Sequence, residues 1–242
     1  MVTLSVNKAA LRTRQLLAFA PLAMLLLGSG CVAPVVSLRQ GPRQYVATDY
    51  DAVLARWTRA QSLVLVDELE TALTVNATFE SWDFRWAYVI RYARDYRLTI
   101  VERQRLLREQ LNETRRSHQF FVALYGSHYK ESNLTKKNSA WVVRLIDARG
   151  NETPPMQIEA IKKSSVLERR YFPYNTVWRQ AFRITFPIET PDGRPTLSPQ
   201  AEWLGLRFAG AYGNTDLIWD LAPAAASNAQ ANTAAPRVNT AR

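Results

Sequence analysis

The chain has 242 residues, 31 Lys+Arg against 21 Asp+Glu, and a formal net charge of +10. This length allows one domain to bury an adequate core without disulfides. The basic residues are scattered and form no long run, which argues against a nucleic-acid-binding protein. Scattered basic charge favours one of two alternatives: attraction to anionic lipid headgroups or glycans, or a solvated surface with no charged partner.

The first thirty residues have the three-part layout of a secretory signal peptide. Lys8, Arg12 and Arg14 come first without any acidic residue, an apolar run occupies residues 16–27, and small residues fill 28–30. The apolar run is too short for a permanent transmembrane helix, which needs roughly 20 residues. The sequence therefore predicts export and removal of residues 1–30.

The only cysteine follows in Leu27-Gly-Ser-Gly-Cys31, which resembles the lipobox of bacterial lipoproteins except that Gly28 replaces the commonest residue, leucine. The resemblance covers residues 1–31 and implies cleavage between Gly30 and Cys31, with lipid on Cys31. It leaves no thiol for a disulfide, a nucleophile or a metal site. Because Val32 is not aspartate, it also implies the outer membrane. The alternative is an ordinary signal followed by an unmodified cysteine.

Two flanking segments lack the periodicity of packed structure. Residues 31–48 contain Pro34, Gly41 and Pro42 and predict a tether between the lipid and the domain. Residues 222–242 are mostly Ala, Asn, Thr and Pro and predict a disordered tail, because they could bury too little apolar surface. One domain is therefore expected over residues 49–221.

Helices are expected near the start of this domain. Residues 49–57 predict a short helix with Asp49 as its cap. The apolar period of 3.6 after Ser81 and a capping box from Thr99 to Glu102 predict a helical hairpin over residues 81–117.

Alternating or short apolar runs predict strands on both sides of this hairpin. Turn residues separate them at 147–151 and 191–195. We expect a mainly β fold, an immunoglobulin-like antiparallel β-sandwich of about seven strands with the helical hairpin inserted. The globular part resembles uncharacterised envelope lipoproteins with such a sandwich. The expected strands are 69–79, 119–125, 140–147, 157–161, 177–188, 202–208 and 215–221.

Motifs of catalysis are missing from the sequence, which has no Gly-rich phosphate loop, no Gly-x-Ser-x-Gly elbow and no His-Glu-x-x-His helix. The two histidines, His118 and His128, match no familiar metal-ligand spacing and are expected to be exposed or capping. The sequence therefore predicts no catalytic residue, no cofactor and no metal site.

Aromatic residues crowd the first helix of the hairpin. Phe84, Tyr88 and Tyr92 lie off the centre of its apolar face, so they are expected to be exposed and to contact a partner. The alternative is that the aromatic residues pack the hairpin onto the sandwich.

Together these patterns predict a non-enzymatic binding or assembly module of the cell envelope, held by its lipid on the outer membrane. The expected partners are the membrane, an envelope protein and anionic glycans or lipid headgroups, but not nucleic acid. A lipoprotein that binds the cell wall or lipopolysaccharide is the alternative, and an envelope hydrolase is a third reading.

Overall fold

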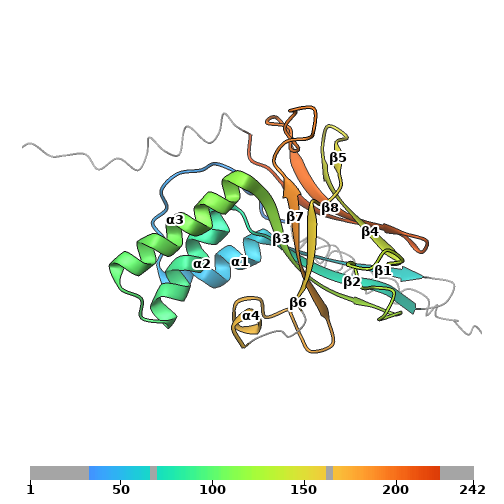
Figure 1. The fold of residues 1–242 in the computed structure, drawn as a ribbon, viewed down its shortest axis with the longest axis horizontal. Helices are drawn as coiled ribbons and strands as arrows, with labels where there is room; N and C mark the ends of the chain where they lie inside the picture. Colours follow the sequence, from blue (N-terminus) through green and yellow to red (C-terminus); the bar gives the residue numbers. More distant parts are fainter. Residues whose placement is uncertain (1–32, 66–69, 162–165, 224–242) are drawn as a thin grey trace, which may run out of the picture. The chain divides into compact units, whose positions relative to one another are not determined.

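Two antiparallel sheets and four α-helices form the part of the chain that the computed structural model describes, namely residues 33–65, 70–161 and 166–223. The expectation of a mainly β protein is confirmed (Figure 1). The expected signal peptide, Gly30, Cys31 and residues 224–242 of the expected tail lie outside the described residues.

The first sheet has five strands in the order β1-β2-β3-β7-β6, and the second has four in the order β5-β4-β8-β9. All pairs of neighbouring strands are antiparallel. The first sheet comprises β1 (Thr58–Leu65), β2 (Glu70–Phe79), β3 (Ser117–Gly126), β7 (Gln180–Pro187) and β6 (Gln157–Ile161). The second comprises β5 (Glu152–Thr153), β4 (Trp141–Asp147), β8 (Trp203–Gly210) and β9 (Gly213–Asp220).

The helical hairpin is present, and its second helix begins at the predicted capping box. Thr99 Oγ1 accepts a hydrogen bond from the Glu102 backbone N–H, and the Glu102 carboxylate accepts one from the Thr99 backbone N–H at 2.8 Å. No described helix combines the length and the apolar composition that crossing a membrane requires. The helices are α1 (Tyr50–Trp57), α2 (Trp82–Asp95), α3 (Ile100–Arg116) and α4 (Val166–Tyr171), preceded by a 3₁₀ turn at Ala47–Asp49.

Strand β3 lies at the centre of the packing because both of its faces are buried. The ring of Phe120 lies 5.6 Å from that of Trp219 in the second sheet, while the ring of Phe121 stacks at 3.8 Å on Phe172, which follows α4. Figure 1 shows α1, α2 and α3 gathered on one side of β3, and β4, β5 and β8 on the other. The five-stranded sheet is thus covered by the second sheet on one face and by aromatic side chains on the other.

The segment before α1 packs on the domain, so the expectation of a tether is wrong for residues 33–48. Val36 is buried, and its backbone N–H donates to the Asp220 carbonyl at 2.8 Å beside a bridge to Leu221. The indole N–H of Trp82 donates to the Gly41 carbonyl at 2.7 Å. Backbone pairing with β9 and a contact with α2 therefore hold a segment that has no period of its own.

Three elements were not expected from the sequence, namely β1, β5 and α4. Strand β1 is an edge strand without a buried residue, β5 has two residues and α4 has six, so none offers a sustained period. The expected cap of α1 is also wrong, because Asp49 has helical backbone angles and its carboxylate accepts from the Val46 backbone N–H at 2.8 Å.

Candidate functional site

A cleft of about 350 Å³ lies where the hairpin meets the five-stranded sheet, and we call it the first cleft. Helices α2 and α3, strands β3 and β7, and the segment of α4 each supply part of its wall. Polar and charged side chains form one part of its wall and aromatic side chains another. Small-ligand sites combine both kinds of side chain.

The polar side is a buried network around Glu80. Its carboxylate accepts from Arg85 at 2.7 Å and from Arg183 at 3.4 Å. The Arg85 guanidinium also donates to the side-chain oxygens of Gln110 at 2.7 Å and Gln119 at 2.6 Å. The side chains of Glu80 and Arg85 are only 7% and 4% exposed. Burying such charges costs free energy even when they are paired, so these ion pairs are weak evidence of stabilisation.

The charge of Glu80 sets the electrostatics of this polar side. Its negative charge raises the pKa of Arg183, although burial acts in the opposite direction. The Arg183 guanidinium group therefore stays charged beside this carboxylate.

The aromatic side consists of Phe84 and Tyr88 from α2, together with Tyr171 and Phe172 at the end of α4. The rings of Tyr88 and Tyr171 meet edge to face at 5.1 Å, and those of Phe84 and Phe172 lie 5.8 Å apart. Burial raises the pKa of Tyr88 to about 12, so its hydroxyl is neutral near pH 7. The wall is thus largely apolar with two phenol groups in it, those of Tyr88 and Tyr171.

The residues expected to bind a partner occupy different positions relative to this cleft. Phe84 is 2% exposed, so the expectation that it is exposed is wrong. Helix α2 is covered on several sides rather than one, because α1, α3 and the end of α4 all contact it. Tyr88 is half-buried and lines the cleft, while Tyr92 is half-buried beside the rings of Tyr88 and Tyr171. Partner binding by Phe84, Tyr88 and Tyr92 stays a prediction.

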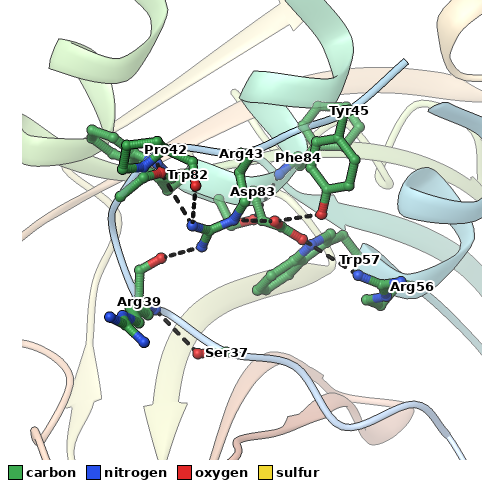
Figure 2. A network of polar contacts seen from close by, with 12 residues as sticks. Ser37, Arg39, Pro42, Arg43, Tyr45, Arg56, Trp57, Trp82, Asp83 and Phe84 are labelled. Carbon is green, nitrogen blue, oxygen red and sulfur yellow. Dashed lines mark hydrogen bonds and ion pairs between the residues drawn. The ribbon is translucent and has the colours of Figure 1, made fainter. Parts of the chain in front are cut away.

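A second polar network lies on another side of α2 and is centred on Asp83 (Figure 2). Its carboxylate accepts from Arg43 at 2.8 Å, from the Tyr45 hydroxyl at 2.6 Å and from the Trp57 indole N–H at 3.0 Å, and Arg56 lies 3.6 Å away. Figure 2 shows these groups converging on Asp83 from the segment before α1 and from the end of α1. Asp83 therefore fixes residues 43–57 to the hairpin.

The donors around Asp83 keep it ionised. Burial by itself would raise the pKa of Asp83, but hydrogen bonds from Tyr45, Trp57 and Arg43 outweigh it and lower the pKa below its usual value. Burial and the same hydrogen bond raise the pKa of Tyr45 to about 12. We regard this network as structural, since both oxygens of the Asp83 carboxylate accept hydrogen bonds from side chains of the protein.

The histidines do not come together. His118 lies within β3, half-buried, with its ring 6.0 Å from that of Phe79, so the expectation of an exposed or capping residue is wrong for it. Burial lowers the pKa of His118 to about 4. His128 is exposed in the loop after β3. Among the described residues, no group of three or more His, Cys, Asp or Glu side chains could hold a metal ion.

The polar side of the first cleft was missed by the sequence analysis. Glu80 directly follows an apolar strand, and Arg85 stands among the aromatic residues of α2. A charged residue in such surroundings is a signal of a buried ion pair. The partner Arg183 lies 103 residues after Glu80, however, and nothing local points to it.

Comparison of the chain with protein-family models, with curated proteins and with solved structures found no match.

Proposed function

We propose that this protein is a lipid-anchored module of a bacterial outer membrane that binds a partner without catalysing a reaction. The observation that carries the binding role is the first cleft, in which an aromatic wall faces a buried network around Glu80. Apolar side chains of similar volume in place of these charges would often stabilise a domain at least as well. The retained charges and the open space beside them support a binding site.

The anchor is supported by the lipobox-like segment that ends at Cys31. Val36, five residues later, is fixed to the end of β9 by backbone hydrogen bonds. Five residues of extended chain span at most about 18 Å. Lipid on Cys31 would therefore hold the domain close to the membrane surface rather than on a long tether, and several acyl chains on one residue would make the attachment stable.

Binding is a better reading than catalysis because the most enclosed carboxylate of the cleft is already engaged. Glu80 bridges Arg85 and Arg183, so each of its two carboxylate oxygens already has a protein partner. The hydroxyl of Tyr88 has a raised pKa, which makes it a weak acid there.

An immunoglobulin-like sandwich is also part of the proposal. The order β2-β3-β7-β6 has the pairing of strands A, B, E and D in that fold, and β4-β8-β9 has the pairing of strands C, F and G. In this assignment the hairpin α2–α3 lies between strands A and B, and β1 extends the first sheet. Domains of this architecture commonly present binding surfaces on their loops and insertions.

The anchor is tested by the intact mass of the protein from membrane fractions, beside a Cys31→Ala variant. We expect loss of residues 1–30 and a gain of lipid mass in the natural protein but not in the variant. A cleaved chain with an unmodified Cys31 would contradict the anchor.

The cleft is tested by placing a photo-crosslinking phenylalanine analogue at Tyr88 in living cells. Tyr125, which is exposed on β3, provides the matched control position. We expect a discrete crosslinked product from position 88 that is missing from position 125. The same products from both positions, or none from either, would contradict a binding role for the cleft.

A further inference from the structure

A second cleft, of about 490 Å³, lies between α4, the start of β7 and the loop after β3. Arg169 of α4 and Arg179 at the start of β7 both line it, together with Tyr129 and Val177. The side-chain amide of Gln180 donates to the Tyr129 carbonyl at 2.7 Å, which holds the loop against β7. The second cleft is thus formed by segments that are far apart in the sequence.

The charge of the second cleft is not balanced by the protein. No Asp or Glu is among its lining residues, in contrast to the first cleft, which is lined by Glu80, Glu113 and Glu168 and where Glu80 pairs with both arginines. Half-buried Arg179 donates to the neutral Asn76 side chain, and burial lowers the pKa of its guanidinium group. Within the described ranges, neither Arg169 nor Arg179 forms an ion pair with a carboxylate.

The carboxylates of the neighbouring elements, Glu168 of α4, Glu159 of β6 and Glu131 of the loop after β3, are not among the residues that line the second cleft. Glu168, beside Arg169 on α4, lines the first cleft, and Glu159 of β6 raises the pKa of Arg183. Arg179 is half-buried and Arg169 is exposed. Taking a guanidinium group partly out of water costs free energy, which a nearby anion offsets. The missing negative charge in the second cleft therefore points to an anionic ligand group, which arginine recognises well.

The rim of the second cleft is apolar and unusually exposed. Val177 and Tyr129, which line the cleft, are 72% and 62% exposed, and Trp178, which lies between Val177 and Arg179 in the chain, is 77% exposed. Aromatic faces pack well against the C–H face of a sugar ring, and exposed tryptophan, tyrosine and arginine together are typical of binding sites. The ligand thus combines an anionic group with a ring or another apolar body.

We propose that the second cleft binds an anionic cell-wall glycan, with a carboxylate or phosphate group on Arg169 and Arg179 and a sugar ring on Trp178. The choice of a glycan over a membrane lipid rests on the proposed lipid anchor. Val36 pairs with the end of β9 through the Asp220 carbonyl. Nearby, Arg59, at the start of β1 just after α1, donates to the Ile218 carbonyl of β9. Val36 therefore lies at the end of the sheets that adjoins the helices.

The second cleft lies towards the opposite end of the first sheet. Trp178 precedes Gln180, which pairs with Leu124 near the end of β3 away from the helices. The eight residues of β7 span about 26 Å at about 3.3 Å per residue. A chain anchored beside Val36 therefore presents Trp178 away from its own membrane, where the cell wall is the anionic material within reach.

The proposal is tested with the full lipidated protein in detergent, by co-sedimentation with isolated peptidoglycan sacculi. Sacculi whose carboxylates have been amidated provide the uncharged reference. The variants are Arg169→Gln with Arg179→Gln, and Trp178→Ala. The control is Arg149→Gln, which removes one positive charge from an exposed turn, against the two removed by the double variant. Thermal unfolding of each variant confirms that it is folded.

We expect binding that weakens with salt and is lost on amidated sacculi. The double arginine variant and Trp178→Ala each lower the affinity by about tenfold, as expected for the loss of charge-assisted hydrogen bonds or of a stacked ring. Arg149→Gln leaves it within about twofold. An equal loss in Arg149→Gln would show that only general charge is involved, and no binding to sacculi would overturn the proposal.

Competition distinguishes the source of the anionic group. We expect glucose 6-phosphate to displace the protein from sacculi and glucose, which lacks the anionic group, not to displace it. Stronger displacement by dihexanoyl phosphatidylglycerol would assign the second cleft to a lipid headgroup and overturn the assignment to a glycan.

Discussion

Replacing Asp83 by alanine tests whether the network on α2 holds the N-terminal segment to the hairpin. The change removes the acceptor of three hydrogen bonds, from Arg43, Tyr45 and Trp57. Trp57 is fully buried, so its indole N–H would have no water to replace the lost acceptor. Arg43 would keep its bonds to backbone carbonyls but lose its counter-ion.

The magnitude follows from these lost partners. A buried donor left without an acceptor costs about 1–3 kcal/mol, and breaking a buried ion pair from one side costs about 3–5 kcal/mol. The Arg43 and Arg56 side chains are 21% and 43% exposed, and water offsets part of their loss. We expect Asp83→Ala to lower the free energy of unfolding by about 3–4 kcal/mol at pH 7.

The effect should depend on pH in a defined direction. The pKa of Asp83 is lowered in the folded protein, so its contribution to stability is present above the unfolded value of about 3.9. It is lost as the pH falls through the lower pKa of the folded state. The difference between natural protein and variant should therefore shrink below about pH 4.

The assay is urea unfolding followed by tryptophan fluorescence, at pH 7 and at pH 3. The control is Asp51→Ala, since Asp51 is 81% exposed and lies 3.8 Å from Arg91, an ion pair expected to contribute less than about 1 kcal/mol. If Asp83→Ala costs no more than this control, the network does not hold the segment. A difference that grows towards acid pH would also contradict the reasoning.

Three other substitutions address the core and the sheets. The pKa of His118 is about 4 in the folded state and about 6.5 when unfolded, so stability should fall as the pH drops from 6.5 to 4. A His118→Asn variant, followed by urea unfolding across that range, should lose this slope, and an NMR pKa near 6.5 would contradict it. Gly210→Ala should cost about 1–3 kcal/mol in thermal unfolding, because the new Cβ would lie 2.2 Å from the Ala140 carbonyl oxygen; an unchanged melting temperature would show that the strand can shift freely. Phe172→Ala should cost about 3–5 kcal/mol in urea unfolding, since it removes the ring stacked on Phe121; a cost below about 1 kcal/mol would place that ring outside the core.

The sequence alone determined the elements whose signals are local. The capping box at Thr99 and Glu102 predicted the start of α3 because both partners lie within one helical turn. The predicted turns contain Gly150 and Gly193, whose positive φ angles of 83° and 73° are ones that glycine adopts readily. Strand β6 was predicted with its observed bounds, Gln157–Ile161. The signal peptide and lipid anchor stay predictions, since their residues lie outside the described part.

Only the tertiary structure decided which faces of these elements are buried and which charges meet. A single amphipathic period assumes one buried face, yet Phe84 and Arg85, neighbours on α2, are both buried because several elements surround that helix. Arg183 comes from a strand far from Glu80 in sequence. Edge strand β1 is held by pairing with β2 rather than by a pattern of its own. Long-range pairing and ion pairing leave no local period, so only elements with a sustained pattern can be predicted from the sequence, while the packing creates both clefts.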